Sequence, residues 1–235
     1  MRQYAFFDAD ETLIPFKTMF EFKRFLTWQL MEKDHAKAAA EDSRFRQQIH
    51  QMATTLPREE INRFYYSGFA GLKAEYLFAS GRLWYQQLKR ANIRLFIQPV
   101  LDLMAQWHAN NIEPVLVSGS ADFILQPFCQ ELGISRVLCS RLQQQNGVFN
   151  GQLTGQPVIG NGKAIAMRAF AQQRQLDLAT CYAVGDHVSD FPMLETAGQA
   201  YVVSNGNQDM VQAAQGKGWR VIHTPVLQAQ TIQFL

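Results

Sequence analysis

The sequence predicts an α/β protein with a Rossmann-like, mostly parallel sheet, helices on both faces, an inserted all-helical cap and a small β-hairpin extension. In the second half of the chain, short apolar runs alternate with helical patterns, as in parallel strands joined by crossover helices. A long segment with only helical patterns follows the first apolar run. Asn146-Gly147 stands between two possible strands, which is a strong hairpin signal.

The elements of the first part follow from local patterns. Residues 3–7 are an apolar run that predicts a short buried strand. Residues 18–33 carry apolar side chains at helical spacing, and Pro57 stands where proline favours the start of a later helix. Helical patterns continue over three further ranges, 35–53, 58–70 and 72–92.

From residue 93 the pattern changes to alternation. The expected elements are an apolar run at 93–97, helix 99–110, strand 114–118, helix 122–132, a hairpin within 137–155, helix 163–174, strand 180–185, helix 191–197, strand 200–203, helix 207–215 and strand 219–222. We therefore expect a Rossmann-like core of residues 1–13 and 94–235, with a helical cap of residues 14–93 inserted after the first strand.

The charge of the chain argues against some partners. The net charge of +2 is too small to favour nucleic acid or a membrane surface. Residues 14–92 hold 13 basic and 8 acidic side chains, so the positive excess lies in the expected cap. This excess is consistent with a solvated helical surface or with a basic lid that attracts anions over an acidic core.

The cysteines and the apolar stretches indicate a compartment. Cys129, Cys139 and Cys181 lie in apolar stretches without metal-ligand spacing, so we expect buried free thiols and a reducing environment. No signal-peptide pattern precedes Asp8, and no apolar stretch is long enough to span a bilayer. We expect a cytoplasmic protein, without membrane or nucleic-acid partners, that is a monomer or a homodimer.

Polar side chains stand where three predicted strands end and where one helix begins. They are Asp8 and Asp10 after the first strand, Ser118 at the end of strand 114–118, Lys163 at the head of helix 163–174, and Asp186 and Asp190 after strand 180–185. Ligands of open α/β sheets bind at the carboxyl ends of the strands. Together these residues predict one phosphoryl-transfer site.

The first motif suits hydrolysis in two steps. A carboxylate such as Asp8 can attack phosphorus and form an aspartyl-phosphate. Asp10, two residues on, lies on the same side of an extended segment, where it can protonate the leaving alkoxide and then deprotonate water. Thr12 is placed either to orient Asp10 through a hydrogen bond or to cap a turn.

A carboxylate and a phosphate dianion repel each other, so a positive charge is needed to bring them together. Mg²⁺ can supply this charge, because it prefers oxygen ligands such as carboxylates. Asp186 is the leading candidate ligand, with Asp8 beside it and the backbone carbonyl of Asp10 as a third. Asp190 either binds the metal through water or holds the ammonium of Lys163, and it can also cap the helix that follows it.

The remaining motifs supply groups for the phosphate. Ser118 offers a hydroxyl, and the Gly119 and Ser120 amides add donors near a helix start. Lys163 is a compact positive charge for the other phosphate oxygens, and the turn Gly160-Asn161-Gly162 before it could aim its side chain inward.

In this order the motifs resemble those of the haloacid dehalogenase-like (HAD) superfamily, in its phosphatase branch. The resemblance implies a nucleophile at Asp8, an acid–base at Asp10, a phosphate-stabilising pair at Ser118 and Lys163, and metal acids at Asp186 and Asp190. It also implies a Mg²⁺-bound core that hydrolyses phosphomonoesters under a substrate-selecting cap, as in the subfamily that includes phosphoserine phosphatases. The hairpin falls where that branch has a small sheet extension. The acid at position 10 argues against a dehalogenase.

Two positions depart from the phosphoserine phosphatase pattern. Those enzymes usually place Glu early in the cap to hold the substrate ammonium, where this chain has Lys17, and Asn before the last acid, where it has Ser189. A cation at position 17 would repel an amine and favour a carboxylate, a phosphate or a hydroxyl, so we expect a substrate other than phosphoserine. His187 either faces the substrate or lies in solvent. Three side chains near the start of the cap either touch substrate or pack, namely Phe16, Met19 and Phe20.

The sequence thus favours a Mg²⁺-dependent phosphatase that acts on a small phosphorylated metabolite. Two alternatives stay open. A phosphotransferase or mutase would pass the phosphoryl group from Asp8 to an acceptor alcohol, because only the entry of water separates the two reactions. A non-catalytic module would use the same scaffold to bind a phosphorylated ligand.

Overall fold

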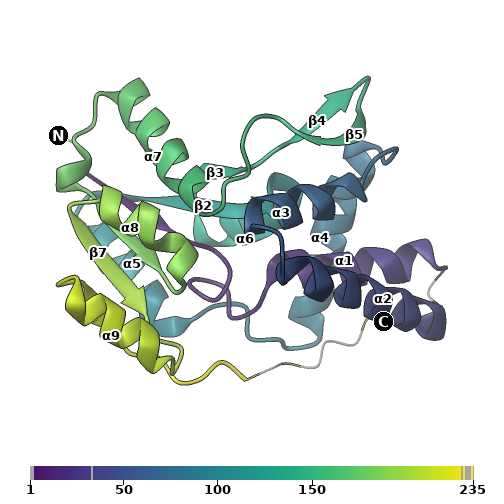
Figure 1. Ribbon diagram of the computed structural model, residues 1–235, viewed down its shortest axis with the longest axis horizontal. Coiled ribbons are helices and arrows are strands. Elements are labelled where there is room, and N and C mark those ends of the chain that lie inside the picture. The colour runs from purple at the N-terminus through teal and green to yellow at the C-terminus, as the bar shows by residue number, and fades with distance from the viewer. Residues whose placement is uncertain (1–2, 33, 229, 231–233, 235) are drawn as a thin grey trace.

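The computed structural model describes residues 3–32, 34–228, 230 and 234 (Figure 1). Six strands form one parallel sheet in the order β3-β2-β1-β6-β7-β8. The strands are β1 (Gln3–Phe7), β2 (Ile112–Ala121), β3 (Arg136–Ser140), β6 (Tyr182–Gly185), β7 (Gln199–Val203) and β8 (Arg220–Ile222). This confirms the predicted Rossmann-like α/β class.

Helices cover both faces of the sheet. They are α5 (Gln98–Ala109), α6 (Asp122–Leu132), α7 (Asn161–Arg174), α8 (Phe191–Thr196) and α9 (Gln208–Gly216). Alternation along β1 separates the two faces: Phe7 packs on Trp107 of α5 at 5.7 Å between ring centroids, whereas Phe6 packs on Phe170 of α7 at 5.7 Å. The fully buried β1 is therefore apolar at every position from Tyr4 to Phe7.

Four helices lie between β1 and α5 in the chain and to one side of the sheet (Figure 1). They are α1 (Thr18–Leu30), α2 (His35–Ala53), α3 (Arg58–Ser67) and α4 (Ala74–Arg90). Phe22 of α1 packs on Trp84 of α4 and on Phe123 of α6, at 5.6 Å and 5.5 Å between centroids. One apolar cluster therefore joins these helices to α6 and to one face of the sheet. We keep "cap" as the name of residues 14–93, and the division into a core of 1–13 and 94–235 and this cap stays a prediction.

The predicted hairpin is confirmed. Strands β4 (Leu142–Gln145) and β5 (Val148–Leu153) pair antiparallel around Asn146 and Gly147, whose φ angles of 51° and 76° suit this turn. The Gly71 amide donates to the carbonyl of Phe149 at 2.8 Å, and the Phe149 amide donates to Leu72 at 2.9 Å. The hairpin is thereby bonded to the loop after α3.

Two stretches differ from the sequence prediction. The apolar run 93–97 forms no strand; it carries the chain back from the cap, and the Ile97 amide donates to the Leu13 carbonyl at 2.9 Å. Pro99, in the first turn of α5, favours a helix start there. Residues 136–140 form β3, which was expected to be part of the hairpin region; it is an edge strand of the main sheet, with an apolar run of only three residues between Arg136 and Ser140.

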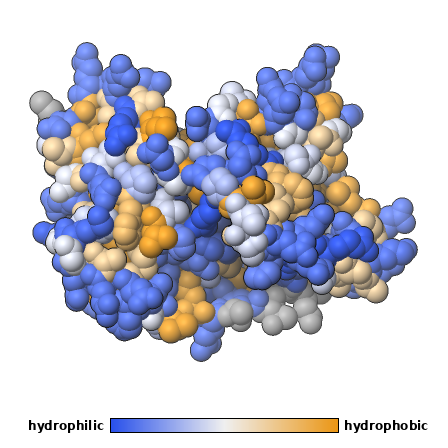
Figure 2. Space-filling model, in the orientation of Figure 1, coloured by the Kyte–Doolittle hydropathy of each residue, from blue (hydrophilic) through white to orange (hydrophobic). Residues whose placement is uncertain are grey.

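The surface is mostly hydrophilic on the face that Figure 2 shows, and it is hollowed between two lobes. Within the described part of the chain, we find no helix that combines the length and the apolar character needed to cross a membrane.

Candidate active site

The carboxyl ends of β1, β2 and β6 meet at one edge of the sheet. Phe7 is in register with Leu116 on one side and with Val184 on the other, so the residues after these positions reach the same level. A cavity of about 500 Å³ lies there, between the sheet and the cap. All the predicted site residues line it: Asp8, Asp10, Lys17, Ser118, Gly119, Ser120, Lys163, Asp186, Ser189 and Asp190.

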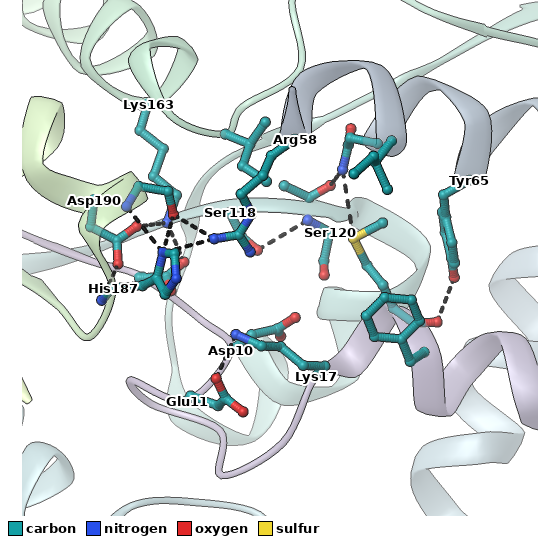
Figure 3. Close-up of a pocket in the computed structure, with 18 of the residues that line it drawn as sticks. Asp10, Glu11, Lys17, Arg58, Tyr65, Ser118, Ser120, Lys163, His187 and Asp190 are labelled. Atoms are coloured by element: carbon teal, nitrogen blue, oxygen red, sulfur yellow. Dashed lines mark hydrogen bonds and ion pairs between the residues drawn. The ribbon is translucent and has the colours of Figure 1, made fainter. Parts of the chain in front are cut away.

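Lys163 joins the first and last motifs (Figure 3). Its Nζ lies 2.5 Å from Oδ1 of Asp8 and 2.6 Å from Oδ1 of Asp190, and the side chain is only 4% exposed. Burial alone would lower the pKa of Lys163, but Asp190 and Asp8 together raise it. The side chain is therefore a fixed positive charge beside the expected nucleophile.

Asp190 uses both carboxylate oxygens. Oδ1 accepts from Lys163, while Oδ2 accepts from the backbone amides of Asp186 and His187 at 3.2 Å and 3.1 Å. Burial acts to raise the pKa of Asp190, but the opposing effects of Lys163 and the two amides are larger together. The pKa of Asp190 is therefore below its ordinary value. The expected hold on Lys163 is confirmed. The expected side-chain cap of the next helix was wrong, because the carboxylate turns back toward its own loop.

Three buried carboxylates, those of Asp8, Asp186 and Asp190, have oxygens within 4.8 Å of one another. Burial, with Asp8 and Asp190 beside it, raises the pKa of Asp186 well above its ordinary value. Lys163 contacts Asp8 and Asp190. Lys17 opposes the rise in the pKa of Asp186 but is itself paired with Glu11, so ionisation of all three acids leaves negative charge in excess. A donor set of carboxylate oxygens with excess negative charge fits Mg²⁺.

Thr18, and not Thr12, holds the Asp10 carboxylate. Thr12 donates to Oδ1 of Asp186 at 2.9 Å, so the expectation that it orients Asp10 was wrong. Thr18, the first residue of α1, donates to Oδ1 of Asp10 at 2.7 Å. Burial raises the pKa of Asp10 to about 6, although Lys17 and the Thr18 hydroxyl oppose the rise. A carboxyl group that titrates near neutral pH can both donate and accept a proton.

The Ser118-Gly119-Ser120 segment continues β2 to Ala121, beyond the expected strand end at Ser118. The Ser118 hydroxyl accepts from the Ser120 amide at 3.1 Å. The Gly119 carbonyl accepts from the side chains of Asn62 and Tyr66, both on α3, at 3.1 Å and 2.9 Å. The cap thus holds the segment expected to bind phosphate, a contact that no local sequence pattern indicates.

Lys17 and Arg58 bring positive charge to the cavity from the cap (Figure 3). Lys17 Nζ pairs with Glu11 at 2.5 Å. Arg58, at the start of α3, donates from one Nη to Nδ1 of His187 at 2.8 Å and to the Ser189 hydroxyl at 3.0 Å. Burial, and then the Arg58 charge, lowers the pKa of His187. His187 therefore lies in the cavity wall against the cap. No local sequence pattern had indicated Arg58 as a site residue.

The parallel sheet and the acidic cavity at its carboxyl edge are those of a Rossmann-like α/β protein with a ligand site at its strand ends. Residues 5–195 match the model of the haloacid dehalogenase-like hydrolase family, and the chain belongs to that family. The match confirms the resemblance that the motifs indicated.

Curated relatives of this chain include proteins with phosphatase names. A probable phosphatase of Mycobacterium tuberculosis is 33% identical over 121 residues, which are 52% of this chain and 42% of that protein. The inhibition of morphological differentiation protein of Streptomyces azureus is 31% identical over 67% of this chain and 60% of its own length. The chain thus spans less than two thirds of the length of these curated relatives. A histidinol-phosphatase of Neisseria meningitidis is 22% identical over 95% of this chain and 99% of its own length.

Solved structures share the fold. A Bordetella pertussis protein of unknown function has a TM-score of 0.81 at 22% identity, over 94% of this chain and 98% of that one. A substrate-bound phosphoserine phosphatase has a TM-score of 0.61 at 19% identity, over 86% of each chain. At these identities the likeness concerns the architecture alone.

Proposed function

We propose that the protein is a Mg²⁺-dependent phosphatase that hydrolyses the phosphomonoester of a small metabolite through an aspartyl-phosphate on Asp8. The observation that carries this proposal is the contact of Asp8 with Lys163 inside a cavity that also holds Asp10. The phosphatase names of several relatives in the same hydrolase family support it.

In the first step, a carboxylate oxygen of Asp8 attacks phosphorus and the bond from phosphorus to the alcohol oxygen breaks. Asp10, in its protonated form, gives its proton to the leaving oxygen. Lys163 and the Ser118 hydroxyl lie in the same cavity to bind the phosphoryl oxygens. When bound by Asp8 and Asp186, Mg²⁺ offsets the negative charge of carboxylate and phosphate. Water-mediated binding by Asp190 and a contribution of the Asp10 carbonyl stay predictions.

In the second step, the ionised Asp10 takes a proton from water, and the water oxygen attacks phosphorus. The bond from phosphorus to Asp8 breaks, which releases inorganic phosphate and restores the carboxylate. The same side chain acts as acid and then as base, which requires a pKa near the working pH; the value of about 6 meets that condition. The Thr18 hydrogen bond keeps the Asp10 carboxyl in one orientation through both steps.

The substrate that we propose is not phosphoserine. The cavity lining from the cap includes Lys17 and Arg58 and, among the described residues, no carboxylate. Glu11, the acid next to Lys17, is already paired with it. The ammonium of a substrate such as phosphoserine would therefore lie near cations, and no unpaired carboxylate among the described cap residues of the lining would be there to bind it. Ser189 is uncharged, and its hydroxyl already accepts a hydrogen bond from Arg58.

Phosphate release tests the proposal. The purified protein with Mg²⁺ is expected to hydrolyse an aryl phosphate and members of a metabolite panel that includes phosphoserine and histidinol phosphate. Asp8→Asn should abolish turnover, because an amide is a poor nucleophile, whereas Asp209→Asn on the exposed surface of α9 should not change it. Near-full activity of Asp8→Asn would contradict the mechanism.

Two further measurements separate the alternatives. Borohydride reduction of the enzyme during turnover should convert a phosphorylated Asp8 to homoserine, detected by mass spectrometry. Product analysis with an added alcohol distinguishes hydrolysis from transfer, since a phosphotransferase would yield a new phosphate ester. A tight Mg²⁺-dependent complex without turnover would indicate the binding module instead.

A further inference from the structure

Most of the cavity lining that comes from the cap is apolar, apart from Lys17, Arg58 and Asn62. Three cap helices contribute side chains to it: Met19 and Phe20 from α1, Ile49 and Ala53 from α2, and Ile61 and Tyr65 from α3. The floor is made by the acids, the serines and Lys163. The cavity therefore has one polar end and one apolar end, and its volume of about 500 Å³ is in the range of sites for small molecules.

Helix geometry explains how so small a cap builds this wall. Ile49 and Ala53 are four residues apart on α2, and Ile61 and Tyr65 are four apart on α3, so each pair lies on one face of its helix. The Tyr65 hydroxyl donates to the Met19 carbonyl at 2.6 Å, which uses its polar end within the cap. Tyr65 therefore adds little polar character to the wall.

Three of these side chains are not used by the core of the protein. Phe20, Ile49 and Ile61 are only half-buried, and they belong to neither of the two apolar clusters that hold the fold together. Their apolar surface is left for the cavity. Exposed apolar surface gathered in a concave site indicates a ligand that covers it.

The apolar wall is also unsuited to a short polar alcohol. A phosphate ester of a hydroxylated or zwitterionic alcohol would place its polar groups against Phe20, Ile49 and Ile61, which offer no hydrogen bond. The polar side chains that the cap adds to the lining are already engaged: Lys17 with Glu11, Arg58 with His187 and Ser189, and Asn62 with Gly119. An apolar alcohol would instead exclude water from this surface, which is favourable in proportion to the area covered.

We propose that the preferred substrate is a phosphomonoester whose alcohol carries an apolar body the size of a phenyl ring or a branched alkyl chain. This inference rests on the phosphatase function proposed above. The phosphate binds at Lys163 and Ser118, and the apolar body lies against Phe20, Ile49 and Ile61.

Turnover of matched alkyl phosphates gives the first test. Phenethyl phosphate and glycerol phosphate both have alkoxide leaving groups, so their comparison reports on the body of the alcohol rather than on its acidity. We expect kcat/KM to be higher for phenethyl phosphate by about tenfold or more, from the apolar area covered. Equal values, or a preference for glycerol phosphate or phosphoserine, would overturn the inference.

A binding test works without turnover. In 3-phenylpropyl phosphonate and 3,4-dihydroxybutyl phosphonate, a methylene group replaces the ester oxygen of phenethyl phosphate and of glycerol phosphate, and calorimetry with Mg²⁺ present measures their affinities. We expect the phenylpropyl compound to bind about tenfold more tightly. If neither phosphate is hydrolysed but this preference is found, the proposed function fails and the inference on the pocket stands. If both phosphates are hydrolysed and neither assay shows a preference, the proposed phosphatase function stands and the inference of an apolar substrate body fails.

Variants locate the preference. Ile49→Ser should reduce the preference for the phenyl compound by about threefold to tenfold, because it removes apolar wall without touching the phosphate end. Leu56→Ser is the matched control, since this side chain is 42% exposed in the cap but does not line the cavity. Ile61→Ser gives a second measurement should Ile49→Ser not fold. An unchanged preference in the folded variants would overturn the inference.

Discussion

The hydroxyl of Thr18 donates a hydrogen bond to Oδ1 of Asp10 over 2.7 Å and lies 2.7 Å from the hydroxyl of Ser120. Since the Thr18 proton goes to the carboxylate, Ser120 donates to Thr18. The first residue of the first cap helix thus connects the proposed acid–base to the end of β2. The orientation of Asp10 therefore depends on the position of α1.

This contact predicts the effect of Thr18→Val, a change that keeps the shape and removes the hydroxyl. The carboxyl of Asp10 loses a donor, and we expect kcat for an alkyl phosphate to fall by about tenfold to a hundredfold. Thr18→Ser keeps the donor and should retain most of the activity. Steady-state kinetics on both variants measures this, and equal losses in the two would mean that Thr18 acts through packing alone.

The pKa of Asp10 predicts a pH dependence that differs between leaving groups. With a pKa of about 6, Asp10 loses its proton as pH rises through that value, so the acid form becomes scarce above it. The single-turnover rate of aspartyl-phosphate formation from an alkyl phosphate should fall above about pH 6, approaching tenfold per pH unit. Nitrophenyl phosphate should show no such fall, because its leaving group needs no proton. Identical rapid-quench profiles for the two substrates would contradict the role of Asp10 as the acid.

The same shift predicts a gain of stability in Asp10→Asn. The folded state raises the pKa of Asp10 from 3.8 to about 6 and thus binds the proton more tightly than the unfolded state. The stability contributed by this group is therefore lost as pH rises from about 4 to 6, at a cost of up to about 3 kcal/mol at neutral pH. Without divalent ions, Asp10→Asn should melt at a higher temperature than the parent at pH 7, with the gap narrowing toward pH 4. Asp209→Asn should show no such trend, and a lower melting temperature of Asp10→Asn at pH 7 would contradict the prediction.

Local patterns were enough to predict the floor of the site. Apolar runs followed by Asp8, Ser118 and Asp186 indicate strand ends, and parallel strands bring their carboxyl ends to one edge. The hairpin followed from Asn146-Gly147, whose positive φ angles an Asn-Gly pair adopts readily. The edge strand β3 was missed because its apolar run is only three residues long, Val137 to Cys139, and the nearby Asn-Gly signal assigned it to the hairpin region.

Contacts between the cap and the sheet could not be predicted in this way. Helical spacing shows which face of α3 is apolar, but not that Asn62 reaches Gly119 or that Arg58 reaches His187, 129 residues further on. The hydrogen bond from Thr18 to Asp10 could not be predicted for the same reason, since it depends on where α1 lies. Such contacts are set by the packing of the aromatic cluster around Phe22 and Trp84. Many different combinations of apolar side chains can fill such a cluster, so the sequence pattern alone does not specify how the helices pack.

Arg58 predicts a test of the contact between the cap and the last motif. Arg58→Ala removes both hydrogen bonds to the turn that carries His187 and Ser189, and we expect kcat/KM to fall by about tenfold. Arg63→Ala is the matched control on the same helix, because Arg63 pairs with Glu60 and does not line the cavity. Hydrogen exchange should become faster in the turn of residues 187–190 in Arg58→Ala only. Equal kinetics in the two variants would show that this contact has no part in turnover.

The acidic cluster predicts stabilisation by Mg²⁺ that depends on Asp186. A cation that binds the folded state raises its stability by mass action, by about 2.7 kcal/mol at a hundred times the dissociation constant. Because burial and the neighbouring acids raise the pKa of Asp186, protons compete with the metal, so less Mg²⁺ should be needed at pH 8 than at pH 6. Thermal melts over a Mg²⁺ series measure both effects. Asp186→Asn should remove most of the Mg²⁺-dependent shift while Asp209→Asn keeps it, and an unchanged shift in Asp186→Asn would place the metal away from the three carboxylates.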